Sequence, residues 1–220
     1  MHLVLFDVDG TLVDSQHMIV AAMNRAFADV GLPEPGRAAT LSVVGLSLDE
    51  AMTKLLGTAD GPIKALGEAY KGAYFALREG GGPQEALYPG ALEAIERLAA
   101  RDDVLLGLAT GKSKRGVRAV LDLHDLHGRF VTVQCADDHP SKPHPSMVVT
   151  ALAETGVAPE RAVVLGDTVF DVSMGRAAGI LALGVSWGYH DAAALTAAGA
   201  ESVLDDFADL DPALARLFGW

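Results

Sequence analysis

Short apolar runs bounded by Gly, Asp or Pro recur along the chain. They are too short for helices of ordinary length and are typical of strands buried on both faces of a parallel sheet. They cover residues 3–6, 104–109, 131–133, 162–165 and 180–185. Patterns with helical spacing alternate with them, over residues 91–101, 114–123, 145–155 and 171–178. This order is expected of right-handed βαβ crossovers, so the chain is predicted to be an α/β protein with a doubly wound parallel sheet.

The segment of residues 15–87 breaks this alternation. Its apolar residues follow helical spacing, and no convincing strand pattern is present. The simplest interpretation is a small helical module inserted after the first strand. We therefore predict a core domain of residues 1–14 and 88–220 that carries an inserted helical domain of residues 15–87, with hinges near Asp14 and Gln84.

Three helices are predicted within the inserted domain. Gly31 and Gly57 end the first two helical patterns, as expected of residues that take the left-handed conformation after a helix. Ser47 with Glu50 predicts a capping box at the start of the second helix. A third helical pattern follows and ends at a glycine-rich return.

The composition is that of a folded, acidic protein. The chain has 220 residues, of which 50% are hydrophobic, and its 17 basic and 29 acidic residues give a formal net charge of −12. This length supports a sizeable core, and the acidity argues against a nucleic-acid surface, which relies on Lys and Arg. One compact basic run is ordinarily interpreted as a solvated helix face, although its local field also suits a small anionic substrate. It consists of Lys112, Lys114, Arg115 and Arg118.

The cysteine content and the hydropathy of the chain indicate the cellular compartment in which the protein is expected. Cys135 is the single cysteine, so neither an intramolecular disulfide nor a cysteine-based zinc cluster can form. The longest uncharged stretch, residues 177–190, is shorter than the about 20 residues that a membrane-spanning helix needs. No basic segment precedes the first apolar run, which argues against a signal peptide. We therefore expect a cytoplasmic protein, a monomer or homodimer, with no membrane or nucleic-acid partner.

Acidic residues follow two of the predicted strands. Asp7 and Asp9 end the first strand, where residues two apart share a side and Gly10 permits a sharp turn. Asp167 and Asp171 follow a later strand. Ligands of open α/β sheets bind beyond the carboxyl ends of the strands, and carboxylates about 4 Å apart repel by roughly 4 kcal/mol at an effective dielectric constant of about 20. The acidic residues therefore predict a bound cation, and their oxygen ligands favour Mg²⁺.

Two further segments are candidates for phosphate binding. Thr110 and the backbone amides of Gly111 and Lys112 can form an anion-binding nest at a helix start. Only three residues separate Gly107 from Gly111, whereas a Walker P-loop needs four, so an ATP-binding P-loop is disfavoured. Lys142 lies in a stretch stiffened by prolines, where its charge can be held against a phosphate or a carboxylate.

Taken in order, these motifs resemble those of the haloacid dehalogenase superfamily, and within it the phosphatases similar to phosphoglycolate phosphatase. The resemblance covers nearly the whole chain, since the inserted helical domain is similar to that family's small α-helical cap. The residues that carry it are Asp7-Val8-Asp9-Gly10-Thr11, Thr110-Gly111, Lys142, and Gly166-Asp167 with Asp171. Ser186-Trp187-Gly188-Tyr189 also resembles a loop of these phosphatases, and a buried aromatic turn explains it equally well.

The resemblance implies a Mg²⁺-dependent phosphatase. Asp7 would attack phosphorus to give an aspartyl-phosphate, and Asp9 would act first as a general acid and then as a general base. The metal would be bound by the carboxylates of Asp7 and Asp167 and by the backbone carbonyl of Asp9.

The remaining motif residues would bind or support the phosphate. The resemblance assigns phosphate binding to Thr110, Gly111 and Lys142, and it makes Asp171 a residue that orients Lys142 or a metal-bound water. The substrate would be a small phosphorylated metabolite, with 2-phosphoglycolate preferred. Residues 44–47 of the cap are the candidate specificity loop.

Several alternatives share parts of this pattern. Dehalogenases and phosphonoacetaldehyde hydrolases of the superfamily lack the second Asp of the first motif, so Asp9 disfavours both, and with them a Schiff base on Lys54. A β-phosphoglucomutase-like phosphosugar mutase or a sugar phosphatase stays open, because the mutases share Asp9 and a helical cap. A non-catalytic binding protein on the same scaffold is the alternative of another class, disfavoured because every motif residue is present.

The histidines are expected to have ordinary structural roles. His124 and His127 lie three residues apart but lack a third ligand for zinc. His17 is placed at the start of the first inserted helix, where packing is favoured over substrate contact. His139 and His144 flank the third motif and have no assigned chemistry.

Overall fold

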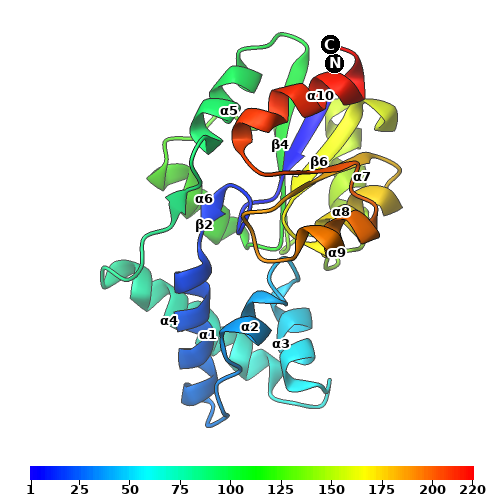
Figure 1. Cartoon of the computed structure of the whole chain (residues 1–220). Helices are drawn as coiled ribbons and strands as arrows, with labels where there is room; N and C mark the ends of the chain where they lie inside the picture. The colour runs from blue at the N-terminus through cyan, green and yellow to red at the C-terminus, as the bar shows by residue number, and fades with distance from the viewer.

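The fold is built on one parallel sheet. The computed structural model describes residues 1–220 and contains a six-stranded sheet with the order β5-β4-β1-β6-β7-β8 (Figure 1). The predicted α/β class is confirmed. The strands are β1 (His2–Phe6), β4 (Val104–Thr110), β5 (Thr132–Cys135), β6 (Ala162–Gly166), β7 (Leu181–Val185) and β8 (Ser202–Leu204). Because every pair of neighbouring strands is parallel, all the carboxyl ends lie at the same edge of the sheet.

Helices cover both faces of the sheet. Successive side chains of a strand point to opposite faces, and in the central strand β1 Val4 and Phe6 pack in one apolar cluster whereas Leu3 and Leu5 pack in the other. The first cluster includes residues of α5 (Ala91–Ala99), α6 (Lys114–Leu123) and α10 (Leu210–Phe218). The second includes residues of α7 (Ser146–Thr155), α8 (Val169–Ala177) and α9 (Ala192–Ala198). Short 3₁₀ turns, η1 (Pro159–Arg161) and η2 (Phe207–Asp209), complete the core.

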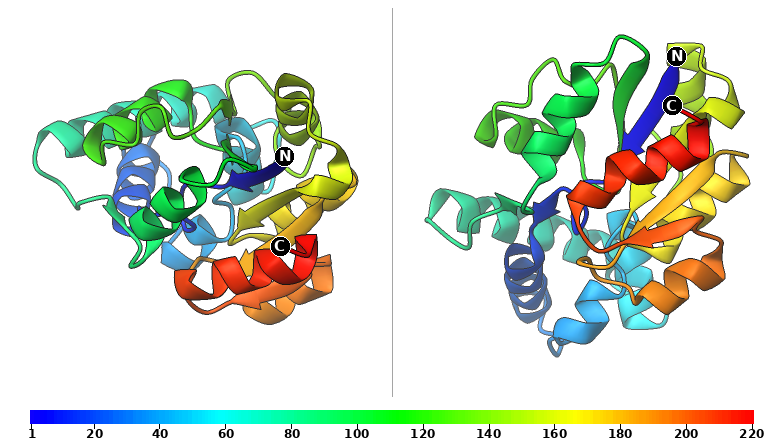
Figure 2. Two further views of the ribbon diagram at one scale, coloured as in Figure 1. Left: turned by 90° about the horizontal axis from the view of Figure 1, so that it is seen from above. Right: turned by 45° about the horizontal axis from the view of Figure 1, so that its top comes forward.

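Four helices stand beyond the carboxyl ends of the strands, away from both termini (Figures 1 and 2). They are α1 (Gln16–Asp29), α2 (Arg37–Leu41), α3 (Leu48–Leu56) and α4 (Ile63–Glu79). They have an apolar cluster of their own, whose buried members are Met23, Phe27, Met52 and Leu66. None of the helices of the protein is both long enough and apolar enough to cross a membrane.

The chain enters and leaves these helices through a two-stranded antiparallel ribbon. β2 (Val13–Asp14) pairs with β3 (Ala86–Leu87), close to the predicted hinges. The expectation that residues 15–87 contain no strand is wrong at β3, because two residues are too few to produce an alternating pattern. The domain boundaries at residues 14 and 87 stay a prediction.

The start of α3 also differs from the prediction. The Ser47 side chain makes no capping hydrogen bond, so the predicted capping box of Ser47 and Glu50 is wrong. The backbone N–H of Ser47, which Glu50 would have to reach in such a box, instead donates to Oγ of Ser141 over 2.7 Å. A capping box that the sequence analysis did not assign forms at α8, between Thr168 and Asp171.

Candidate active site

The carboxyl ends of three neighbouring strands lie side by side, and two of them open into a cavity. Asp7 follows β1, Thr110 ends β4 and Asp167 follows β6. β1 lies between the other two, so this is the position where the strand order reverses and where open α/β sheets bind ligands. The cavity has a volume of about 740 Å³, and its lining includes Asp7, Asp9, Thr110 and Gly111.

Lys142 is buried between two carboxylates. Its side chain is 0% exposed, and Nζ lies 2.7 Å from Oδ1 of Asp7 and 2.6 Å from Oδ1 of Asp171. Burial alone would lower the pKa of Lys142, but the attraction of the two carboxylates outweighs it and raises the pKa. The ammonium is therefore a permanent cation that fixes one oxygen of Asp7.

Three carboxylates form a buried cluster. The ligand atoms of Asp7, Asp167 and Asp171 lie within 4.8 Å of one another. The carboxylate of Asp9 is not in this cluster, although the sequence spacing predicts that it converges with Asp7. Asp171 uses Oδ1 on Lys142 and Oδ2 on the backbone N–H and hydroxyl of Thr168. Asp171 therefore supports Lys142, and both of its oxygens already accept hydrogen bonds.

The cluster fits a divalent cation. With the ammonium of Lys142, its three carboxylates leave two negative charges uncompensated. Oδ2 of Asp7 is buried and has no hydrogen-bond partner. Burial raises the pKa of Asp7 to about 7 despite the opposing attraction of Lys142, and burial and repulsion from Asp7 raise the pKa of Asp167 well above its ordinary value. A hard cation such as Mg²⁺ would stabilise both carboxylates as anions.

Asp167 is fixed from two sides. Oγ1 of Thr11 donates to its Oδ1 over 3.0 Å, and the backbone N–H of Tyr189 donates to its Oδ2 over 2.9 Å. A Cβ on Gly188 would lie 2.1 Å from Cβ of Asp167, so only glycine allows this approach. Nε1 of Trp187 donates to the carbonyl of Thr11 over 3.0 Å. The loop of residues 186–189 is therefore part of the wall around Asp167.

The predicted specificity loop passes over the second motif. A Cβ on Gly111 would lie 2.7 Å from the carbonyl oxygen of Gly45, so glycine is required here. Thr110 is buried, and its Oγ1 accepts a hydrogen bond from the backbone N–H of Lys112 over 3.2 Å. Residues 44–47 all line the cavity. The cap loop therefore faces the same space as Thr110 and Gly111, whereas Lys142 is buried and does not line the cavity.

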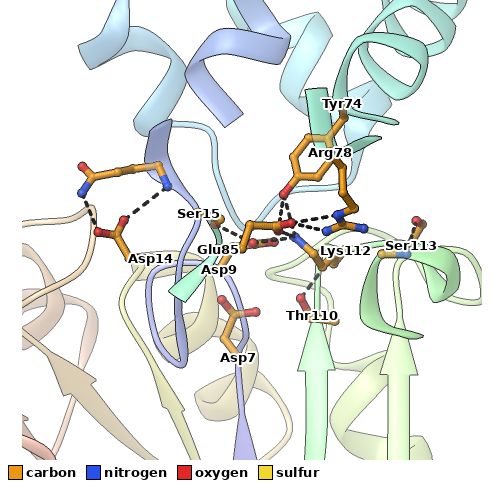
Figure 3. Close-up of polar contacts among 12 residues, drawn as sticks. Asp7, Asp9, Asp14, Ser15, Tyr74, Arg78, Glu85, Thr110, Lys112 and Ser113 are labelled. Atoms are coloured by element: carbon orange, nitrogen blue, oxygen red, sulfur yellow. Dashed lines mark hydrogen bonds and ion pairs between the residues drawn. The ribbon is translucent and has the colours of Figure 1, made fainter. Parts of the chain in front are cut away.

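Asp9 contacts side chains to which the sequence analysis gave no role in the site (Figure 3). Its Oδ1 accepts hydrogen bonds from Oγ of Ser15 and Nζ of Lys112, both over 2.6 Å. The interpretation of Lys112 as part of a solvated helix face is wrong, since its side chain is 8% exposed and Glu85, 2% exposed, lies 3.5 Å from its ammonium. The signal that could have found Lys112 is its place directly after Thr110-Gly111. No sequence pattern indicates that Glu85 belongs to the site.

The histidines do not join the acidic cluster. His17 and His144 are exposed. His139 lines the cavity, but both of its ring nitrogens are engaged in hydrogen bonds with neighbouring side chains. His124 donates from Nε2 to a backbone carbonyl just before β3 over 2.8 Å, and His127 contacts a surface aspartate.

Known proteins with similar sequences identify the family. The family described as Haloacid dehalogenase-like hydrolase matches residues 4–185. The protein named "Probable phosphatase IndB" of Dickeya dadantii (strain 3937) is 34% identical over 214 residues, which cover 94% of this chain and 91% of that protein. The phosphoglycolate phosphatase of Pseudomonas putida is 29% identical over 97% of this chain and 79% of that protein.

The fold is similar to that of solved hydrolases. A hydrolase from Pseudomonas syringae superposes with a TM-score of 0.85 at 26% sequence identity, over 98% of this chain and 99% of that one. This chain therefore belongs to the haloacid dehalogenase-like hydrolase family. The predictions of this family and of an enzyme are confirmed, and its named relatives are phosphatases.

We expect Mg²⁺ to stabilise the protein more at pH 7.5 than at pH 5. The pKa values of Asp7 and Asp167 are raised, so without metal the folded state binds more protons than the unfolded state, and stability falls as the pH rises from about 4 to 7. Mg²⁺ removes this penalty by binding the ionised carboxylates. Thermal melts in EDTA and in Mg²⁺ should differ by about 5 °C or more at pH 7.5 and by less than about 2 °C at pH 5. Asp167→Asn should abolish most of this difference, and an equal gain at both pH values would contradict the site.

Proposed function

We propose that this hydrolase is a Mg²⁺-dependent phosphatase that cleaves a small organophosphate monoester through an aspartyl-phosphate on Asp7. The observation that carries the proposal is the environment of the Asp7 carboxylate. Lys142 fixes Oδ1, whereas Oδ2 has no hydrogen-bond partner, in a residue that lines the cavity. An oriented carboxylate with one free oxygen is suited to act as a nucleophile.

The first step transfers the phosphoryl group to Asp7. Oδ2 attacks phosphorus, and the new O–P bond forms as the bond from phosphorus to the leaving oxygen breaks. The electron pair of the broken bond stays on the leaving oxygen, which takes the proton of the Asp9 carboxyl group. Asp9 lines the same cavity as Asp7, and general acid catalysis of this kind contributes about 10²- to 10⁴-fold. The alcohol then leaves.

The second step returns Asp7 to its starting form. The carboxylate of Asp9 takes a proton from water while the water oxygen attacks phosphorus, and the bond between phosphorus and Asp7 breaks. The electron pair returns to the carboxylate of Asp7, and inorganic phosphate is released. Asp9 is again protonated, so the two steps form a closed cycle.

The remaining motif residues are suited to stabilise the phosphoryl group. Thr110 and the backbone amide of Gly111 lie at the cavity, and the ammonium of Lys142 balances charge at Asp7. Asp7, Asp167 and the backbone carbonyl of Asp9 would hold Mg²⁺. When bound, the metal supplies neutralisation of the charge on the phosphoryl oxygens.

The preferred substrate is 2-phosphoglycolate. Several similar proteins carry the name phosphoglycolate phosphatase. Arg115 is among the residues that line the cavity. Its guanidinium lies 4.1 Å from the centroid of the Phe75 ring and makes no ion pair with a carboxylate. Arg115 therefore offers a charge partner for a second anionic group, such as the carboxylate of this substrate.

A panel of phosphorylated metabolites tests the proposal. The purified protein with Mg²⁺ should release phosphate from 2-phosphoglycolate with a kcat/KM at least about 10-fold above that for sugar phosphates, pyrophosphate and p-nitrophenyl phosphate. A preference for hexose phosphates would overturn the choice of substrate. Release that does not exceed that of the Asp7→Asn variant would overturn the phosphatase itself.

A sugar phosphatase or a β-phosphoglucomutase-like mutase is the second candidate. The cavity of about 740 Å³ has room for a hexose phosphate beneath the inserted helices. A mutase must return the phosphoryl group to another hydroxyl of the same sugar instead of to water. Release of inorganic phosphate from a hexose phosphate without formation of an isomer would exclude the mutase.

A further inference from the structure

The two oxygens of Asp9 have different surroundings. Oδ1 accepts hydrogen bonds from Ser15 and from the ammonium of Lys112, both over 2.6 Å (Figure 3). Oδ2 takes part in neither bond, and Asp9 lines the cavity. Two short bonds to one oxygen fix the plane of the carboxylate, which leaves Oδ2 as the oxygen that can exchange a proton with a ligand.

The ammonium of Lys112 faces three oxygens of the protein. An ammonium group has three N–H donors. Its Nζ lies 2.6 Å from Oδ1 of Asp9, 3.4 Å from Oη of Tyr74 and 3.5 Å from Oε1 of Glu85. All three acceptors belong to the protein. The side chain of Lys112 is therefore directed at Asp9 and its supports, although it follows the predicted phosphate-binding turn.

Glu85 holds Lys112 from the other side. Its side chain is 2% exposed, and Oε2 accepts a hydrogen bond from Nε of Arg78 over 3.0 Å. Tyr74 donates to its Oε1, and His124 donates to its backbone carbonyl over 2.8 Å. Glu85 thus has anchors on α4 and at the end of α6, which is rigid support for the ammonium on its far side.

The charges of this network balance. Asp9 and Glu85 supply two carboxylates, and Lys112 and Arg78 supply two cations. Removal of Lys112 leaves the two carboxylates without their shared cation. Asp9 would then lose one of the two bonds that set its orientation while Asp7, Lys142 and Asp171 keep theirs.

We infer that Lys112 is a positioning residue for Asp9: it fixes Oδ1 so that Oδ2 meets the leaving oxygen, and Glu85 and Arg78 hold Lys112 in place. The inference rests on the proposed function, in which Asp9 protonates the leaving group. The inference predicts different effects on alkyl and on aryl phosphate esters. An alkoxide needs a proton as it leaves, whereas p-nitrophenolate is stable without one, so misplacement of Asp9 slows the transfer of the phosphoryl group to Asp7 only for the alkyl ester. The later attack of water, in which Asp9 is the base, is slowed for both esters, so the two esters differ in the release of the leaving group.

The test compares two substrates in four proteins. Wild type, Lys112→Met, Lys112→Arg and Lys114→Met are assayed with Mg²⁺ on p-nitrophenyl phosphate and on the alkyl phosphate that the wild type cleaves best. Lys114→Met is the matched control, because Lys114 is two residues further along the chain, at the start of α6, and 62% exposed. Glu85→Gln, which keeps the shape of the side chain but not its charge, is assayed in the same way.

Lys112→Met should lower the single-turnover rate of leaving-group release by about 100-fold on the alkyl ester and by less than about 3-fold on p-nitrophenyl phosphate, with the half-saturating concentration for both within about 3-fold of wild type. Lys112→Arg should recover most of the loss, Glu85→Gln should show a smaller loss of the same selectivity, and Lys114→Met should match wild type. Equal losses of this rate on both esters, or an effect confined to the half-saturating concentration, would overturn the inference alone. Absence of turnover in the wild type would overturn the proposed function and the inference with it.

Discussion

Replacement of Asp7 by Asn is expected to lower kcat at least about 10⁴-fold on every substrate, because loss of the nucleophile removes the covalent step. The amide has the shape of the carboxylate but cannot form a phosphate ester that water cleaves. Steady-state assays on the preferred substrate and on p-nitrophenyl phosphate measure the loss. Both substrates should be affected alike, whereas variants that disturb Asp9 should slow the release of the leaving group mainly for the alkyl ester.

The Asp7→Asn protein should remain folded. Lys142 keeps its contact with Asp171 over 2.6 Å, and the substitution removes one of three mutually repelling buried carboxylates. The melting temperature in EDTA at pH 7.5 should therefore equal or exceed that of the wild type. Activity within about 10-fold of wild type in a folded Asp7→Asn protein would contradict the nucleophile assignment.

Lys142→Met should affect both activity and stability. The ammonium is fully buried between Asp7 and Asp171, and removal of one partner of a buried ion pair costs about 3–5 kcal/mol of the free energy of unfolding. The change also frees Oδ1 of Asp7 and removes a cation next to the reacting phosphate, so kcat should fall about 10³-fold. Chemical denaturation and steady-state kinetics measure the two effects. Lys64→Met, at an exposed lysine of α4, is the control and should leave both unchanged.

The stability loss of Lys142→Met should depend on pH. In the wild type, burial raises the pKa of Asp7 to about 7 and Lys142 lowers it, so removal of Lys142 raises it further. A carboxyl group whose pKa is higher in the folded state favours folding at low pH, and this contribution is lost as the pH rises through the folded pKa. The difference in stability from the wild type should therefore be smaller at pH 5 than at pH 8. A loss of equal size at both pH values would show that cavity formation, rather than uncompensated charge, dominates.

The sheet could be predicted from the sequence because its signals are local. Each central strand is a continuous apolar run, and the motif residues Asp7, Thr110 and Asp167 lie at the end or just after the end of such a run. Parallel strands bring these ends to one edge whatever the connections between them. The sequence pattern does not predict β8. This strand has three residues and only one buried side chain, so it produces no apolar run.

The surroundings of Asp9 could not be predicted, because they depend on contacts between distant segments. Lys112 is separated from Asp9 by 103 positions and Tyr74 from Lys112 by 38. As part of a basic run next to a helix, Lys112 has the pattern of a solvated side chain, and only the fold turns it inward. The capping box at Ser47 failed for a related reason, since its backbone N–H is taken by Ser141. Local patterns do not report which polar groups already have a tertiary partner.

The central claim is that the phosphoryl group is carried by Asp7. Its most direct test is chemical trapping: the enzyme is mixed with Mg²⁺ and substrate, quenched, and treated with borohydride, which reduces an aspartyl-phosphate to homoserine but leaves a free carboxylate unchanged. Peptide mass spectrometry should find homoserine at position 7 and nowhere else, and only when substrate was present. Sustained turnover with no reduced residue at Asp7, or with the modification at another carboxylate, would contradict the account.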